Sequence, residues 1–161
     1  GMKVFDIFAG GGYYTEILSR LVGDTGAVVH YNNAPWAMFV KKATDARFAE
    51  NRLGNVEMMV APPESLLGHA PQFDAAIFVL GMHDVYYEDP ANQWVAIDRE
   101  KFLQGMYDLL KPGAVLGIID HNAEAGTDPA IVGKSVHRVD PAVVIKDLEA
   151  MGVVKGEESI A

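Results

Sequence analysis

The sequence contains no cysteine. Its absence excludes disulfide bonds, thiolate zinc sites and catalysis by a thiol, but it does not identify a compartment. No apolar run approaches the roughly 18 residues of a membrane span, and no targeting segment is visible in the chain. The localisation is therefore unknown. The cytoplasm is the default expectation, and a longer exported precursor remains compatible with this chain.

Clustered positive charge is also lacking. The chain has 13 lysines and arginines against 22 aspartates and glutamates, for a net charge of −9 and a pI near 4.9. Proteins bind the phosphate backbone of nucleic acids through clusters of lysine and arginine side chains. We therefore expect no nucleic-acid partner and no membrane partner, and we expect a small-molecule ligand or a basic partner.

The composition predicts one globular domain over residues 1–161, because half of the residues are hydrophobic and 22% are charged. Strand and helix patterns alternate along the whole chain without an internal repeat. This alternation predicts a doubly wound α/β domain with a mostly parallel sheet and helices on both faces.

The expected strands and helices follow from apolar periodicity and from glycine and proline signals. The expected strands are residues 3–8, 27–31, 56–60, 73–80, 114–120 and a short one near 153–154. The expected helices are residues 13–22, 35–51, 99–110 and 141–151, with a loop at 121–140. The second helix is expected to bury Trp36, Phe39, Val40, Ala43 and Phe48.

The first strand is followed by three consecutive glycines, Gly10 to Gly12, and then by a helix. Glycines allow a sharp turn and a close approach to a ligand, and the helix aims free N–H groups at the same place. A glycine turn also closes many βα units that bind nothing, so it leaves a structural role open. In such sheets ligands bind beyond the carboxyl ends of the strands, which here are residues 8–14, 32–33, 61–64, 81–84 and 120–122.

These motifs resemble the class I S-adenosylmethionine-dependent methyltransferases, over essentially the whole chain. Asp6 to Gly12 is similar to the first motif of that family, an acidic residue followed by spaced glycines, with Phe8 where a glycine is common. Phe73-Asp74 and the Leu-Leu-Lys-Pro-Gly-Ala step at 109–114 resemble further landmarks. The run Gly-Gly-Gly-Tyr-Tyr-Thr-Glu at 10–16 is similar to a bacterial group of predicted methyltransferases.

The resemblance implies a Rossmann-like fold, S-adenosylmethionine as cofactor and methyl transfer to a small-molecule acceptor. It places the methionine end of the cofactor at the glycine turn, the ribose at the end of the second strand and the adenine after the third. The cofactor-binding residues that it implies are Asp6, Phe8, Gly10, Gly11, Gly12, Asn32 and Glu64.

Two positions depart from the family pattern. Asn32 stands where a carboxylate usually accepts hydrogen bonds from the ribose, and Pro62-Pro63 replaces a segment that usually meets the adenine. A neutral acceptor binds less strongly than a charged one, and proline has no N–H to donate. We expect weaker cofactor binding than in the family, and the alternative function is a non-catalytic ligand- or partner-binding domain. A dinucleotide-binding oxidoreductase ranks below both, because the Lys-Pro-Gly step favours the methyltransferases.

Four polar residues, His83, Asp84, Asp120 and His121, follow the fourth and fifth strands. A histidine oriented by an aspartate can act as a general base, the four together can hold a divalent metal, and all four can simply cap strand ends. We predict His83, Asp84 and His121 as catalytic residues and assign no metal. His137-Arg138 is either a partner for a substrate carboxylate or part of a solvated loop.

The resemblance also predicts a fold shortened at both ends, because the family usually ends in an antiparallel strand pair and only one such strand is expected here. An uncovered sheet edge favours pairing with a second copy. We therefore expect a homodimer.

Overall fold

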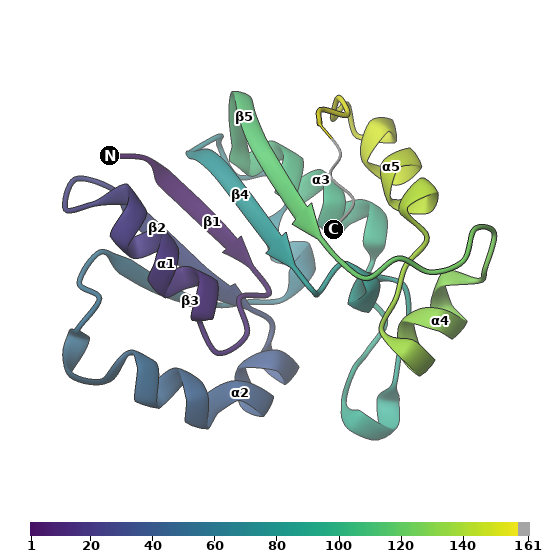
Figure 1. The fold of residues 1–161 in the computed structure, drawn as a ribbon, viewed down its shortest axis with the longest axis horizontal. Helices are drawn as coiled ribbons and strands as arrows, with labels where there is room; N and C mark the ends of the chain where they lie inside the picture. The colour runs from purple at the N-terminus through teal and green to yellow at the C-terminus, as the bar shows by residue number, and fades with distance from the viewer. Residues whose placement is uncertain (158–161) are drawn as a thin grey trace.

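The computed structural model, which describes residues 1–157, has one five-stranded sheet in the order β3-β2-β1-β4-β5 (Figure 1). All four strand pairs are parallel, which confirms the doubly wound fold. The strands are β1 (Lys3–Ile7), β2 (Ala27–Asn32), β3 (Val56–Val60), β4 (Phe73–Val79) and β5 (Leu110–Ile119).

Helices cover both faces of this sheet, with α1 on the near side and α3 behind the sheet in Figure 1. They are α1 (Tyr13–Val22), α2 (Ala34–Arg47), α3 (Arg99–Leu109), α4 (Pro129–Val136) and α5 (Pro141–Ala150). Four short 3₁₀ turns are η1 (Ala49–Asn51), η2 (Pro63–Leu66), η3 (His83–Val85) and η4 (Pro90–Asn92). No helix within residues 1–157 is long and apolar enough to cross a membrane.

The segment 121–140 is not a continuous loop, because it contains α4. The side chain of Asp128 accepts a hydrogen bond from the Ala130 N–H, and Pro129 follows it at the first helical position. Asp140 caps α5 in the same way, again with a proline after it. An Asp-Pro pair satisfies a free N–H and presets the backbone for a helix. The same signal therefore starts both helices.

The expected buried stripe on α2 is wrong. No residue of α2 is buried, and Phe39 is 81% exposed. The helix contacts β2, whose neighbour β3 is an edge strand with residues that are only partly covered. The sheet offers too little surface on this side to bury an apolar face, and the helix ends at Arg47 before η1 instead of continuing to residue 51.

The expected strand near 153–154 is also absent from the described residues. The N–H of Val153 instead donates to the carbonyl of Leu148, so this segment closes the end of α5. The strand β5 begins at Leu110, four residues earlier than the expected start at residue 114. A bulge accommodates the extra residues, because the pairing shifts between Phe73 opposite Leu110 and Ala75 opposite Val115.

An aromatic layer supports the carboxyl edge of the sheet. Phe8 lies in it with a left-handed backbone, φ 46°. Its buried ring stacks on Tyr31 and Phe102, with centroids 5.7 and 5.4 Å away, and meets Phe78 and Trp94 edge-on. Offset and edge-on aromatic pairs add to the stabilisation from burial alone. The residue that replaces a family glycine is therefore a part of the core.

Candidate functional site at the carboxyl edge of the sheet

The predicted site residues lie in two groups at this edge. One group surrounds the glycine turn, where β1 and β2 end, and the other follows β4 and β5. The groups are adjacent, because a Cβ placed on Gly81, just after β4, would lie 3.4 Å from the Cβ of Phe8. A ligand that spans both groups is what the doubly wound fold is suited to bind.

The turn itself requires glycine for two different reasons. Gly10 and Gly12 both have a left-handed backbone, with φ of 56° and 83°. A Cβ on Gly10 would meet nothing within 4 Å, whereas a Cβ on Gly12 would lie 2.7 Å from the ring of Phe48. Gly10 therefore faces open space, and Gly12 is pressed against the end of α2.

The side chain of Asn32 holds the turn in place. Its Oδ1 accepts the Gly10 N–H at 3.0 Å, and its Nδ2 donates to the Gly10 carbonyl at 3.0 Å. The same Nδ2 lies 3.0 Å from Nε2 of His30. An amide nitrogen only donates, so His30 Nε2 is the acceptor. Asn32 is buried, and its amide is oriented by three partners.

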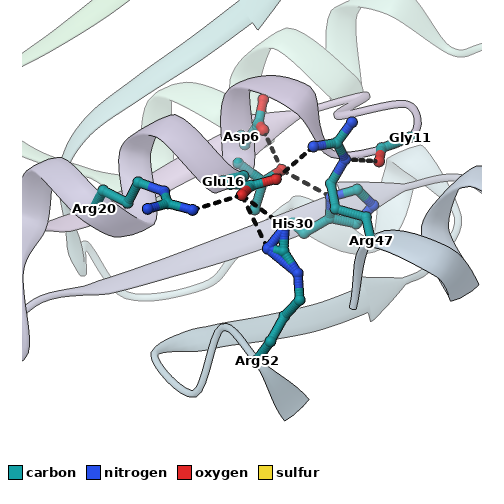
Figure 2. Close-up of polar contacts among 8 residues, drawn as sticks. Asp6, Gly11, Glu16, Arg20, His30, Arg47 and Arg52 are labelled. Atoms are coloured by element: carbon teal, nitrogen blue, oxygen red, sulfur yellow. Dashed lines mark hydrogen bonds and ion pairs between the residues drawn. The ribbon is translucent and has the colours of Figure 1, made fainter. Parts of the chain in front are cut away.

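A hydrogen-bond chain continues from His30 to the first strand. Thr15 Oγ1 lies 2.9 Å from His30 Nδ1 and 2.5 Å from Asp6 Oδ2. Since Nε2 accepts, the neutral ring carries its proton on Nδ1 and donates to Thr15, whose hydroxyl donates to Asp6. Figure 2 shows this chain beneath α1.

Burial favours the neutral form of both ionisable residues in this series of hydrogen bonds, Asp6 and His30. Desolvation raises the pKa of Asp6 to about 7, although the Thr15 hydroxyl opposes the shift. Desolvation lowers the pKa of His30 to about 4. A charge removed from water is disfavoured whatever its sign.

A second set of contacts ties the turn to α2. Arg47 Nε donates to the Gly11 carbonyl at 2.8 Å, and its Nη1 pairs with Glu16 at 2.5 Å. Arg20 and Arg52 approach the same carboxylate from other sides (Figure 2). These arginines lower the pKa of Glu16. Glu16 thus joins α1 and α2 around the turn.

The remaining cofactor-side prediction, Glu64, lies in η2, and its side chain is exposed. Its charge adds to the effect of burial in raising the pKa of Tyr31, whose hydroxyl donates to the Ala61 carbonyl. The segment after β3 is therefore joined to the end of β2.

In the group after β4 and β5, His83 and Asp120 form a pair. His83 Nδ1 lies 2.9 Å from Asp120 Oδ1, and the His83 N–H donates to Oδ2 at 2.9 Å. Burial opposes the charged imidazole, but the bond to Asp120 and the charges of Asp120 and Asp84 outweigh it and raise the pKa of His83. Burial likewise opposes the Asp120 carboxylate, yet the His83 bonds hold the pKa of Asp120 below its usual value.

Asp84 lies on the other side of the same imidazole. Its Oδ1 is 3.4 Å from His83 Nε2 and accepts the Tyr87 hydroxyl at 2.8 Å. Its Oδ2 and Nε1 of Trp36 are both buried without a hydrogen bond of ordinary length among the described residues. Burial raises the pKa of Asp84, and the charge of His83, the Tyr87 hydroxyl, the charge of His137 and the weak attraction of the Trp36 N–H oppose that shift.

The structure adds His137 to this group. Its ring centroid is 5.3 Å from that of His83, and ligand atoms of His83, Asp84 and His137 all lie within 4.8 Å of one another. His121 contributes differently, because its side chain is exposed while its N–H donates to Asp120 at 2.8 Å. Sequence spacing alone does not bring residue 137 to residue 83. The helix start at Asp128-Pro129 would have predicted α4, but not the contact that brings its end to residue 83.

Four aromatic residues near this edge differ in exposure. Tyr86 and Trp94 are buried, whereas Tyr13 is 60% exposed and Tyr14 39%.

Curated relatives of the chain are methyltransferases. Over 122 residues it is 33% identical to ubiquinone/menaquinone biosynthesis C-methyltransferase UbiE of Enterobacter sp. (strain 638), and 32% identical to that of Cronobacter sakazakii. Each match covers 74% of this chain and 43% of the relative, so the chain spans less than half the length of these proteins. No family model matches the chain.

Solved structures share the fold. A SAM-dependent methyltransferase from Aquifex aeolicus aligns with a TM-score of 0.70 and 21% identity, covering 97% of this chain and 74% of that one. An arsenic (III) S-adenosylmethionine methyltransferase from Chlamydomonas reinhardtii aligns with a TM-score of 0.66 and 19% identity, covering 94% of this chain and 51% of that one. The curated relatives, at 32–33% identity over 74% of this chain, show that it belongs to the class I S-adenosylmethionine-dependent methyltransferase family, and the strand order of the sheet agrees with it.

Proposed function

We propose that this chain binds S-adenosylmethionine and transfers its methyl group to a small-molecule acceptor. The observation that carries the proposal is the adjacency of the open glycine turn after β1 and the His83 cluster after β4. A methyl donor and its acceptor must lie side by side and in line, and alignment supplies most of the catalysis for such a transfer. The curated relatives, which are C-methyltransferases by name, support the same chemistry.

On the cofactor side, Gly10, Gly11 and Gly12 are proposed to meet the methionine end. Asn32 Oδ1 already accepts the Gly10 N–H, but a carbonyl oxygen has a second lone pair for a ribose hydroxyl. Glu64 is the proposed polar contact for the adenine. Asp6 and Phe8 are buried beneath the turn, so their proposed part is to hold its shape.

On the acceptor side, His83, Asp84 and His121 are the proposed catalytic residues. The exposed side chain of His121 and the His83–Asp84 pair flank Asp120. Polar groups fixed at this edge can orient an acceptor toward the methyl group. The bound cofactor supplies the reactive methyl itself, on a sulfonium that leaves readily.

A second candidate is a domain that binds a ligand without catalysis. The observation in its favour is the amide of Asn32, which is engaged by Gly10 and His30 and offers a ribose no charge.

Calorimetric titration of the chain with S-adenosylhomocysteine, with NAD as the control ligand, tests the cofactor. We expect micromolar binding of the first and none of the second. Gly10→Val should abolish binding, and Gly10→Ala, which adds only a methyl group in open space, shows whether the turn still folds. Binding of NAD alone, or of neither ligand by folded protein, would overturn the proposal. Product formation in an acceptor screen separates the enzyme from the non-catalytic candidate.

We further propose a homodimer. Within residues 1–157, β5 forms one edge of the sheet, with Val115 67% and Ile119 56% exposed. Exposed apolar edge strands favour pairing with another strand. Light scattering at micromolar concentration should give twice the chain mass, and a monomer mass would refute the dimer.

A further inference from the structure

We propose that His83, Asp84 and His137 bind a divalent transition-metal ion such as Zn²⁺. Their ligand atoms lie within 4.8 Å of one another, and they form a set of two imidazole nitrogens and a carboxylate. This donor set suits Zn²⁺ and its neighbours in the first transition row more than Mg²⁺ or Ca²⁺, which prefer oxygen ligands alone. Three protein ligands leave at least one position open for an oxygen of water or of a ligand.

His83 is prepared to bind a metal through Nε2. Its other nitrogen, Nδ1, and its backbone N–H are both held by the carboxylate of Asp120. Histidine ligands of metal ions usually donate their second ring N–H to a carboxylate in this way, which fixes the tautomer and the ring orientation. Asp120 is itself fixed by the N–H of His121. Nε2 is thus left facing Asp84.

Asp84 supplies the carboxylate of this set. The residue is 3% exposed, and its Oδ2 and Nε1 of Trp36 are both buried without a hydrogen bond of ordinary length among residues 1–157. Its Oδ1 lies 3.4 Å from His83 Nε2. Two ligands at zinc bond lengths of about 2.1 Å and a tetrahedral angle are about 3.4 Å apart. The spacing of these two atoms is that of neighbouring ligands of one ion.

His137 is brought to the cluster by α4. A Cβ on Gly133 of that helix would lie 3.0 Å from the His83 carbonyl and from the ring of Tyr87, so a glycine lets α4 approach closely. His137 then ends the helix in a left-handed conformation, φ 53° and ψ 55°. The next residues are tied down by a bridge between Asn122 and Val139. Strained backbone that is fixed on both sides is a feature of functional positions.

The exposure of the three residues indicates where an exchangeable ligand would enter. His83 and Asp84 are buried, whereas His137 is exposed. An ion here would be reached from the side of α4. Its role toward an acceptor rests on the proposed function: an ion at this place would orient an oxygen of the acceptor beside the methyl donor, and metal ions hold oxygen nucleophiles well. Binding of the ion does not depend on that role.

The test is calorimetric titration of the full chain with ZnCl₂, supported by the visible absorption of the Co²⁺-loaded protein. We expect one ion per chain and a Co²⁺ spectrum of four- or five-coordinate nitrogen and oxygen ligands. His83→Ala should weaken Zn²⁺ binding at least 100-fold. His137→Asn should do the same while keeping the fold, because asparagine tolerates the left-handed conformation that residue 137 adopts.

The matched control is His69→Ala, because His69 is exposed in the segment between β3 and β4 and contacts the Ser65 carbonyl. It should bind Zn²⁺ within twofold of the unchanged chain. The proposal is refuted if the chain binds no Zn²⁺, if His137→Asn binds as tightly as the unchanged chain, or if His69→Ala loses binding. Titrating S-adenosylhomocysteine into the same samples distinguishes the two proposals, because metal binding without cofactor binding would leave this site standing and remove the proposed function.

Discussion

Asn32 binds both backbone polar groups of Gly10, accepting from the N–H and donating to the carbonyl, each at 3.0 Å. A carboxylate at position 32 could accept but not donate. It would leave the Gly10 carbonyl and His30 Nε2 without their donor and would place a charge in a buried position. Asparagine at this position is therefore matched to the histidine beneath it.

Asn32→Asp should accordingly lower the free energy of unfolding by about 2 kcal/mol, the usual cost of leaving buried polar groups unpaired. It should also weaken S-adenosylhomocysteine binding, although it restores the residue type common in the family. Urea unfolding and calorimetry measure the two effects.

The matched control is Asn33→Asp, because Asn33 only accepts the Trp36 N–H and caps α2, a task that aspartate performs equally well. Tighter binding by Asn32→Asp at unchanged stability would contradict the assigned network.

The buried carboxyl of Asp6 should make stability depend on pH. Its pKa of about 7 in the folded chain lies above the ordinary value of 3.8, so its favourable contribution is complete below pH 3.8 and is lost as pH rises through 7. The three-unit shift corresponds to roughly 4 kcal/mol. Asp6→Asn, which still accepts from Thr15, should gain stability relative to the unchanged chain between pH 4 and 7. Urea unfolding across that range measures the difference.

Two comparisons check this assignment. His30, whose pKa is lowered to about 4, contributes stability that is lost as pH falls from 6.5 through 4, so it opposes Asp6 in the unchanged chain. Asp140→Asn should show the opposite sign in a lower pH window, because backbone N–H donors lower the pKa of Asp140 from 3.8: relative to the unchanged chain it should lose stability as pH rises toward 3.8 and stay constant between pH 4 and 7. A difference between Asp6→Asn and the unchanged chain that stays constant with pH would rule out a buried, shifted carboxyl.

Gly12→Ala should destabilise the chain more than Gly10→Ala. Both changes place a Cβ on a left-handed residue at a cost of about 1 kcal/mol. Only the Cβ at position 12 meets the Phe48 ring, at 2.7 Å, and such overpacking adds about 1 to 3 kcal/mol. Combining Gly12→Ala with Phe48→Leu should recover part of that difference in thermal unfolding. Equal losses from the two glycine changes would show that Phe48 does not restrict the turn.

Gly133→Ala should weaken Zn²⁺ binding about tenfold without unfolding the protein. The added methyl group would push α4 from the His83 carbonyl and withdraw His137. Gly117→Ala is the control, because its Cβ would be 3.8 Å from the nearest atom, an ordinary contact. Calorimetry with ZnCl₂ compares the two. Unchanged affinity in Gly133→Ala would mean that α4 does not set the position of His137.

The first four strands were predictable because their apolar runs are continuous and their ends carry glycine, asparagine or proline, whereas the early start of β5 and the absence of a strand near 153–154 were not predicted. The pairing of His83 with Asp120 followed from topology, since both residues come directly after strands that the doubly wound order makes neighbours. α2 was harder to predict, because its apolar residues follow a helical period but none of them is buried, and the helix makes few contacts with the sheet. His137 depends on a tertiary contact through Gly133, and no periodicity of the sequence encodes that contact.

The Asn32–His30–Thr15–Asp6 chain and the Arg47 contact to the turn all lie within the first 47 residues, as consecutive βα units. The His83 cluster is instead assembled from three separate segments that carry His83, Asp120 and His137. The half that holds the turn can form from local contacts early in folding, while the other half waits for β5 and α4. Substitutions in the segment from 121 to 140 should therefore disturb the His83 cluster and leave the network around the glycine turn intact.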